Sequence, residues 1–177
     1  SLNFLKKKFK NVKYLSDYQR DEIIKINKTK NKKNIICYSG KSNKFIDKII
    51  EYTNLPMLKL SGIKSNNVIK ILKSSKLFID FGYHPGKDRL PREAVVLNNC
   101  IITNKKGSAS NSIDIPIKKK YKFLETNNNL PKIEKTINKI IIEYHKEIKH
   151  FKNYKKLVLK EKKKFLVDLK KIFLKKI

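Results

Sequence analysis

The sequence has only two cysteines and no long apolar run. Cys37 and Cys100 lie in apolar, strand-like segments that have neither a CxxC motif nor zinc-ligand spacing. This pattern argues against a zinc site and favours buried, reduced thiols in a reducing compartment such as the cytoplasm. No segment reaches the roughly 18 apolar residues of a membrane span, and no signal peptide is visible.

Arginine is scarce, although the chain is strongly basic. Lys and Arg total 44 against 15 acidic residues, a net charge of +29, yet only Arg20, Arg89 and Arg92 are arginines. Nucleic-acid-binding proteins usually enrich arginine for bidentate contacts to phosphates and bases. RNP-like aromatics and a KH-type GXXG loop are also missing. We therefore interpret the lysines as a solvated surface. The alternatives are a basic nucleic-acid-binding protein and a non-catalytic α/β interaction module.

Short apolar runs alternate with helical patterns over most of the 177 residues, of which 40% are apolar. A chain of this size buries roughly 70% of its unfolded surface, enough for one domain, or one domain plus an appendage. The alternation predicts right-handed βαβ crossovers in a doubly wound, Rossmann-like parallel sheet. We expect strands over 35–38, 56–62, 77–81 and 100–103, helices over 42–54, 66–75 (capped by Ser65) and 90–98, a loop over 113–117, and an edge strand over 121–124.

The strand signals end at Pro131. Residues 131–149 and 151–176 are long helical patterns, and residues 149–177 hold twelve lysines against two acidic residues. We expect an N-terminal fringe over 1–30, a Rossmann-like domain over 31–130 and basic helices over 131–177. The first interpretation of these helices is that they brace the fold. The alternative is a peripheral contact with the anionic inner face of a membrane.

Residues 77–103 differ in character from the rest of the chain, because their charges balance. An apolar run leads into a polar, glycine-containing loop, which then opens an apolar helix. In α/β proteins this arrangement usually builds a ligand site at the carboxyl end of a strand. The charged side chains of the segment are Asp80, Lys87, Asp88, Arg89, Arg92 and Glu93.

The loop contains the parts of a diphosphate site. Gly82 and Gly86 let the backbone approach a ligand, because they carry no Cβ. Lys87 and Arg89 bring positive charge to the mouth of the sheet. The helix that starts at Leu90 directs its free N–H groups at the same place.

Two further side chains of this segment could contact the ligand. Glu93, in the expected first helical turn, could accept hydrogen bonds from ribose or sugar hydroxyls, and His84 could donate to a phosphate or a hydroxyl. Each also has a plain structural interpretation: Glu93 could complement the helix dipole, His84 could be a turn residue, and Asp88 could cap the helix or pair with a neighbouring arginine.

Two more glycine-containing segments should reach the same edge of the sheet. Gly40 and Lys41 follow the first expected strand, and Gly107 and Ser108 follow the fourth. The carboxyl ends of parallel strands lie together, so both segments should flank the loop. Gly107 could expose backbone N–H groups to an anion, or be an ordinary loop glycine.

The stretch DFGYHPGKDRLPREA (80–94) and its continuation to residue 123 resemble the carboxyl-terminal half of bacterial GT-B glycosyltransferases. The nearest likeness is to surface-polysaccharide transferases with an HPGKDRxPREA stretch. Residues 11–23 are similar to the last strand and helix that lead out of a GT-B amino-terminal domain. The resemblance implies that the chain is a segment of a longer enzyme. It would bind a nucleoside-diphosphate sugar as donor and use no metal or cofactor, in agreement with the absence of an Asp-x-Asp motif.

The resemblance also assigns roles to residues. Glu93 would hold the ribose, Gly107 and Ser108 would line the diphosphate, and Lys41 lies near the family's basic phosphate ligand. The family's first glutamate of a Glu pair falls on Pro85 here, and we infer that its contacts pass to His84, Lys87 and Arg89. Asn98 replaces a family glycine, and Cys100-Ile101-Ile102 replaces Pro-Val-Val. The glycan or lipid-linked acceptor and the catalytic base would belong to the amino-terminal half.

Overall fold

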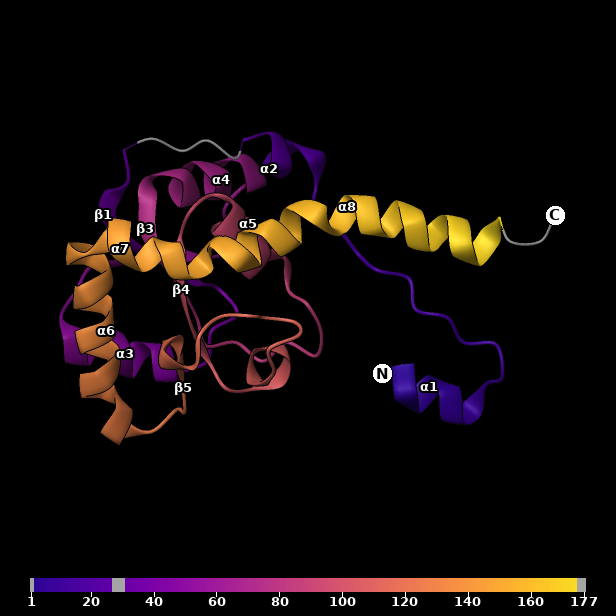
Figure 1. Cartoon of the computed structure of the whole chain (residues 1–177). Coiled ribbons are helices and arrows are strands. Elements are labelled where there is room, and N and C mark those ends of the chain that lie inside the picture. The colour runs from indigo at the N-terminus through magenta and orange to yellow at the C-terminus, as the bar shows by residue number, and fades with distance from the viewer. Residues whose placement is uncertain (1, 27–30, 175–177) are drawn as a thin grey trace.

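The computed structural model describes residues 2–26 and 31–174. Its centre is a five-stranded parallel sheet in the order β2-β1-β3-β4-β5 (Figure 1). The prediction of a Rossmann-like α/β fold is confirmed, and so is the short edge strand, which pairs in parallel with β4. The strands are β1 (Lys33–Ser39), β2 (Met57–Leu60), β3 (Ser75–Asp80), β4 (Cys100–Asn104) and β5 (Lys122–Phe123).

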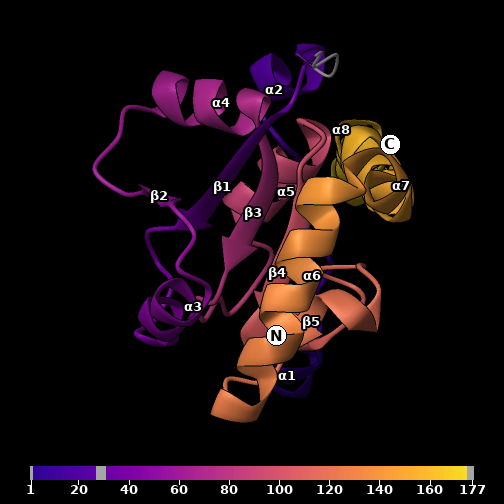
Figure 2. The same ribbon diagram turned by 90° about the vertical axis from the view of Figure 1, so that its left-hand side faces the viewer.

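Helices cover both faces of the sheet, which explains why the middle residues of its inner strands are apolar on both sides. The helix α3 (Phe45–Thr53) packs with α6 (Leu130–Ile142) on one face, and α4 (Ser65–Ser74) packs with α5 (Arg89–Val96) on the other (Figure 2). Asn98 adopts φ 60°, a left-handed conformation that stops α5 as predicted. Ser65 is the first residue of α4, so the expected cap is wrong.

The C-terminal helices differ from the prediction in one respect. The helix expected over 131–149 is divided into α6 and α7 (Tyr144–Glu147), and α8 (Lys152–Phe173) then crosses the fold and extends beyond the sheet (Figure 1). The expected residues 175 and 176 of this last helix lie outside the described residues. Four short 3-10 helices span Gly107–Ser110, Lys119–Tyr121, Asn127–Asn129 and Ile148–Phe151.

The N-terminal segment holds two short helices, α1 (Leu2–Lys8) and α2 (Asp21–Lys25). The strand that the resemblance implied near residue 11 is wrong, because residues 9–20 contain neither helix nor strand. Figure 1 shows α1 set apart from the sheet and joined to it by this extended segment. Residues 27–30 of the expected fringe lie outside the described part of the chain.

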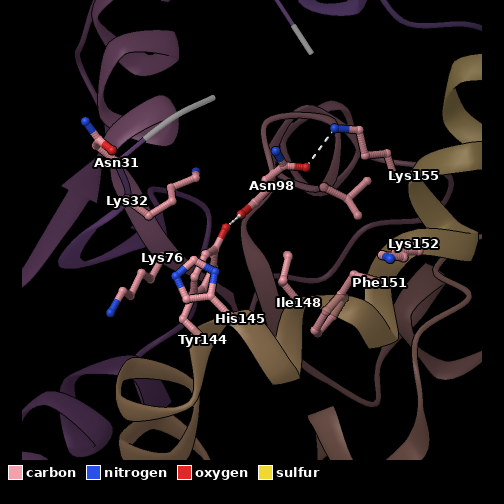
Figure 3. Close-up of a pocket in the computed structure, with 11 residues that line it drawn as sticks. Asn31, Lys32, Lys76, Asn98, Tyr144, His145, Ile148, Phe151, Lys152 and Lys155 are labelled. Carbon is pink, nitrogen blue, oxygen red and sulfur yellow. Dashed lines mark hydrogen bonds between the residues drawn. The ribbon is translucent and has the colours of Figure 1, made fainter. Parts of the chain in front are cut away.

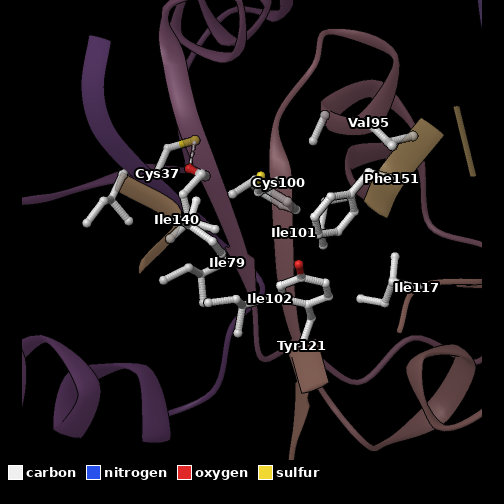
Figure 4. Close-up of a cluster of buried hydrophobic side chains, with 14 of the residues drawn as sticks. Cys37, Ile79, Val95, Cys100, Ile101, Ile102, Ile117, Tyr121, Ile140 and Phe151 are labelled. Atoms are coloured by element: carbon white, nitrogen blue, oxygen red, sulfur yellow. Dashed lines mark hydrogen bonds between the residues drawn. The ribbon is translucent and has the colours of Figure 1, made fainter. Parts of the chain in front are cut away.

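The core lies between the sheet and its helices (Figure 4). Ile79, Ile101 and Ile102 are fully buried in the adjacent strands β3 and β4, and Phe151, from the C-terminal region, lies beside Ile101. Both cysteines are buried free thiols, as predicted. Burial raises the pKa of Cys37 to about 11, so this thiol stays protonated at neutral pH.

Candidate functional site

The loop after β3 is organised around His84, which lies between two aspartates. His84 Nε2 lies 3.0 Å from Asp80 Oδ2, and His84 Nδ1 lies 3.6 Å from Asp88 Oδ2. Asp80 also accepts a hydrogen bond from the Gly82 backbone N–H at 2.9 Å. The hydrogen bond to Asp80 raises the pKa of His84, although burial opposes the charge. The loop therefore favours the protonated form of His84.

The loop after β1 meets this cluster. Lys41 Nζ lies 3.6 Å from Asp88 Oδ1, and 68% of the Lys41 side chain is exposed. The contact is reinforced by the backbone of Phe81, whose N–H donates to Ser42 Oγ at 3.0 Å and whose carbonyl accepts from Asn43 N–H at 3.2 Å. The direction of winding reverses between β1 and β3, so these two loops flank the place where doubly wound folds bind ligands.

The segment after β4 completes this side of the cluster. Ser108 N–H donates to the His84 carbonyl at 2.7 Å. Gly107 has φ 53°, and a Cβ there would lie 2.2 Å from the same oxygen. Ser108 Oγ is buried and makes no hydrogen bond within the described chain. Gly107 thus allows the loops after β3 and β4 to approach each other closely through their backbones.

The other predicted glycines fall into two kinds. A Cβ at Gly40 would lie 2.6 Å from Ser61 Cβ, and one at Gly82 would lie 2.7 Å from His84 Nε2. At Gly86 a Cβ would meet nothing within 4 Å. Protein neighbours therefore account for Gly40 and Gly82, whereas Gly86 borders open space.

Glu93 forms a second cluster beside the first. It lies one residue further into α5 than predicted, just past the first turn, because this helix already starts at Arg89. Its buried carboxylate lies 3.2 Å from Arg20 Nη2 and 3.4 Å from Arg89 Nε. Burial raises the pKa of Glu93, while the two arginines oppose this shift. Arg20 also donates to Ser65 Oγ at 2.9 Å, which ties the N-terminal segment to α4.

Lys87 belongs to a third cluster, which includes α8. Its Nζ lies 3.7 Å from Glu161 Oε1. The other oxygen of Glu161 accepts from Arg92 Nη1 at 3.1 Å, and Arg92 Nη2 donates to Asp17 at 2.6 Å. Lys87 therefore contacts the C-terminal helix α8, whereas Lys41 and His84 belong to the first cluster.

The predicted site residues thus divide into groups. Around the 82–88 loop the structure gathers Gly82, His84 and Gly86 with Lys41, Gly107 and Ser108, whose loops contact it. Gly40 adjoins Lys41 and packs against the end of β2. Arg89 and Glu93 form a neighbouring pair with Arg20. Lys87 is held by Glu161.

Sequence reasoning missed Glu125, which follows β5 at the same edge of the sheet. Its carboxylate accepts hydrogen bonds from Asn43 at 2.8 Å and Asn104 at 2.9 Å, and it pairs with Lys106. Burial opposes its ionisation, but these three partners outweigh burial and lower the pKa of Glu125. The sequence could have indicated Glu125 as a site residue, because it directly follows the expected edge strand and therefore lies at the carboxyl edge of the sheet.

Asp80, His84 and Asp88 each offer a ligand atom, and these atoms lie within 4.8 Å of one another. Their chemistry would suit a divalent transition metal. A metal would have to displace the proton that His84 holds against Asp80, so the raised pKa of His84 weakens binding. The ion pairs alone account for this arrangement.

Comparison with protein-family models gave no match, and neither did comparison with curated proteins. The resemblance to GT-B glycosyltransferases therefore depends on the residues of the 77–123 segment themselves.

Proposed function

We propose that this chain is the nucleotide-sugar-binding domain of a GT-B glycosyltransferase that builds surface polysaccharide. The observation that supports this function best is the meeting of Lys41 with the His84 loop beside the β1/β3 reversal. That position combines two positive groups with the carboxyl edge of a doubly wound sheet, where such folds bind nucleotides.

The two cations are available to a diphosphate in different ways. The Lys41–Asp88 pair is long and its lysine is mostly exposed, so Lys41 can exchange this carboxylate for a phosphate oxygen. The hydrogen bond to Asp80 raises the pKa of His84, which favours a positive charge close by. In this proposal Arg89, which is about half exposed, is the third anion contact.

A ribose contact at Glu93 would require a rearrangement of the second cluster. Glu93 already accepts a hydrogen bond from Arg20 and forms an ion pair with Arg89, and its carboxylate is buried. A ribose hydroxyl would bind there by displacing one of these arginines, and the more exposed Arg89 is the natural one to move. The freed guanidinium would then be able to face the diphosphate.

The acceptor side of the reaction belongs, in this proposal, to an amino-terminal domain. The acceptor would be a glycan or a lipid-linked saccharide.

None of the helices within residues 2–26 and 31–174 is long and apolar enough to cross a bilayer. The α8 helix does expose Leu166 and Phe173 among its lysines, which would suit a peripheral contact with anionic lipid. Co-sedimentation with anionic vesicles at physiological salt tests that contact, and lack of binding excludes it.

Calorimetry with UDP, GDP, ADP and dTDP tests the proposal. We expect one of them to bind, and Lys41→Ala to weaken it about tenfold or more, because a charge-assisted contact contributes roughly 1.5–3 kcal/mol. Lys135→Ala removes the same charge from an exposed position on α6 and should leave the affinity unchanged. Absence of binding across the panel, or equal affinity in Lys41→Ala, would contradict the donor-site assignment.

A further inference from the structure

A second hollow lies at the opposite edge of the sheet from the candidate donor site (Figure 3). It has a volume of about 640 Å³, within the range of small-molecule sites. Its walls come from the amino ends of the strands: Lys32 precedes β1, Lys76 lies near the start of β3, and Asn98 precedes β4. The α7 helix and the first turn of α8 close the other side. We call this hollow the amino-edge pocket.

The amino-edge pocket is lined by basic side chains, and no carboxylate is among the described residues that form it. Its basic residues are Lys32, Lys76, His145, Lys152 and Lys155. Lys76 contributes its aliphatic part, because its Nζ donates to Asn34 and to the Ile141 carbonyl. Figure 3 shows Lys32 and Lys155 extending toward Asn98 from opposite sides.

The two inner lysines donate hydrogen bonds to uncharged groups of the protein. Lys32 Nζ donates to the carbonyls of Leu72 and Ser75, each at 2.7 Å, at the end of α4. Lys155 Nζ donates to Asn98 Oδ1 at 2.7 Å. Burial lowers the pKa of Lys32 to about 7 and also lowers the pKa of Lys155. An ammonium has three protons, so Lys32 retains a donor after both carbonyls are satisfied.

One wall of the pocket is apolar. Val95, Ile148 and Phe151 lie along it. The Tyr144 hydroxyl also lines the space, but it donates to the Asn98 carbonyl at 2.6 Å. Val95 and Phe151 are almost fully buried, so the accessible part of this wall comes mainly from Ile148. A ligand that fills this pocket would therefore place an anionic group near the lysines and an apolar or planar group against Ile148.

We propose that the amino-edge pocket binds a small molecule in which a phosphate group is joined to an apolar or planar body. The phosphate would contact Lys32, Lys152 and Lys155, and the body would lie on the apolar wall. A dianion is favoured because it compensates several like charges that otherwise repel one another at partly desolvated positions. Lysine is suited to phosphate as a compact point charge.

Phenyl phosphate and inorganic phosphate are the probes, with sodium chloride at equal ionic strength as the reference. We expect both anions to raise the melting temperature beyond the chloride reference, and phenyl phosphate to bind more tightly because of its ring. The variants are Lys152→Gln, which is exposed and tolerates change, and Lys32→Met, which keeps the length of the side chain. Each should weaken phenyl phosphate by roughly fivefold or more. Lys135→Gln on α6 is the charge-matched control and should bind like the unmodified chain.

Amide chemical shifts locate the binding. We expect phenyl phosphate to move the resonances of Asn98 and His145, both in the unmodified chain and in Lys41→Ala, which lacks the main cation of the other edge. Shift changes confined to the loops around Lys41 and Gly107 would overturn the proposal. Unchanged binding in Lys32→Met and Lys152→Gln would also overturn it, as would an equal loss in Lys135→Gln.

Proton uptake gives a readout that a purely structural role for Lys32 would not produce. The groups that act on its charge are Lys155, which opposes it, and the thiols of Cys37 and Cys100, which stay protonated because burial raises the pKa of both. A bound dianion favours the protonated amine. Calorimetry near pH 8 in buffers of different ionisation enthalpy should show proton uptake on binding, and Lys32→Met should abolish it. Equal uptake in both proteins would contradict the role of Lys32.

Discussion

Gly107 lies against the backbone of His84, so that the carbonyl oxygen of His84 occupies the space where a side chain at position 107 would begin. The next residue, Ser108, donates its N–H to the same oxygen. The loops after β3 and β4 are thus fixed to each other through a position that only glycine fits. The relative placement of His84 and Ser108 depends on it.

Gly107→Ala should destabilise the fold and displace this loop. The positive φ alone costs an alanine about 1 kcal/mol, and the contact with the His84 carbonyl adds to that cost. Gly62→Ala is the matched control, since Gly62 also has a positive φ but open space around its Cβ position. Urea unfolding should therefore show a larger loss for Gly107→Ala than for Gly62→Ala. Equal losses would contradict the close contact.

His84 should make stability depend on pH. Its pKa is raised in the folded state by Asp80, so its contribution is complete below its unfolded pKa of about 6.5 and is lost as the pH rises through the folded value. We expect the free energy of unfolding of the unmodified chain to fall relative to that of His84→Gln as the pH increases from about 5.5 to 8.5. Urea titrations across that range measure the difference.

Most of the fold could be predicted because its signals are local. The segments 77–79 and 100–102 are continuous apolar runs, and both lie in strands buried under helices. The break between α6 and α7 could not be predicted, because long-range contacts produce it. After the break, the Tyr144 hydroxyl reaches the Asn98 carbonyl and Glu147 accepts from Lys120 at 2.9 Å. The apolar spacing of residues 131–149 is continuous, so it does not reveal these distant hydrogen-bond partners.

The Arg92–Glu161 pair should be important for anchoring α8. Both side chains are largely buried, and Arg92→Met would leave Glu161 with only the longer Lys87 contact. Loss of one partner of a buried ion pair costs about 3 kcal/mol or more. The double variant Arg92→Met/Glu161→Met should recover part of that stability, because it leaves no buried charge unpaired. Urea unfolding of both variants measures this, and equal stability of the two would argue against a buried pair.

Glu93→Gln tests the ribose contact in the proposed donor site. An amide keeps the shape of the side chain but is a weaker acceptor for a hydroxyl. We expect nucleoside diphosphates to bind more weakly to the variant, whereas inorganic diphosphate keeps most of its affinity. Calorimetry with both ligands gives the comparison. A uniform loss for both would show that Glu93 acts by holding Arg20 and Arg89 in place, without a contact to ribose.

The candidate site was predictable only where its residues are close in sequence or follow strands. Lys41, His84 and Ser108 follow three strands of one parallel sheet, and topology brings them together. Two features depend on distant segments and escaped prediction. Arg20 reaches Glu93 across 73 positions of the sequence. Lys87 pairs with Glu161 on α8, and the local sequence pattern that predicts this helix does not show that it packs beside Lys87.

The concentration of all three arginines in these ion-pair clusters has a practical consequence. Lysines are spread over the whole chain, so amine-directed reagents would label it almost everywhere, whereas a guanidine-selective dicarbonyl would label one small region. Within that region Arg89 and Arg20 have exposed side-chain fractions of 51% and 37%, against 5% for Arg92. The order of modification would therefore report the integrity of the Glu93 and Glu161 clusters separately, without any mutation.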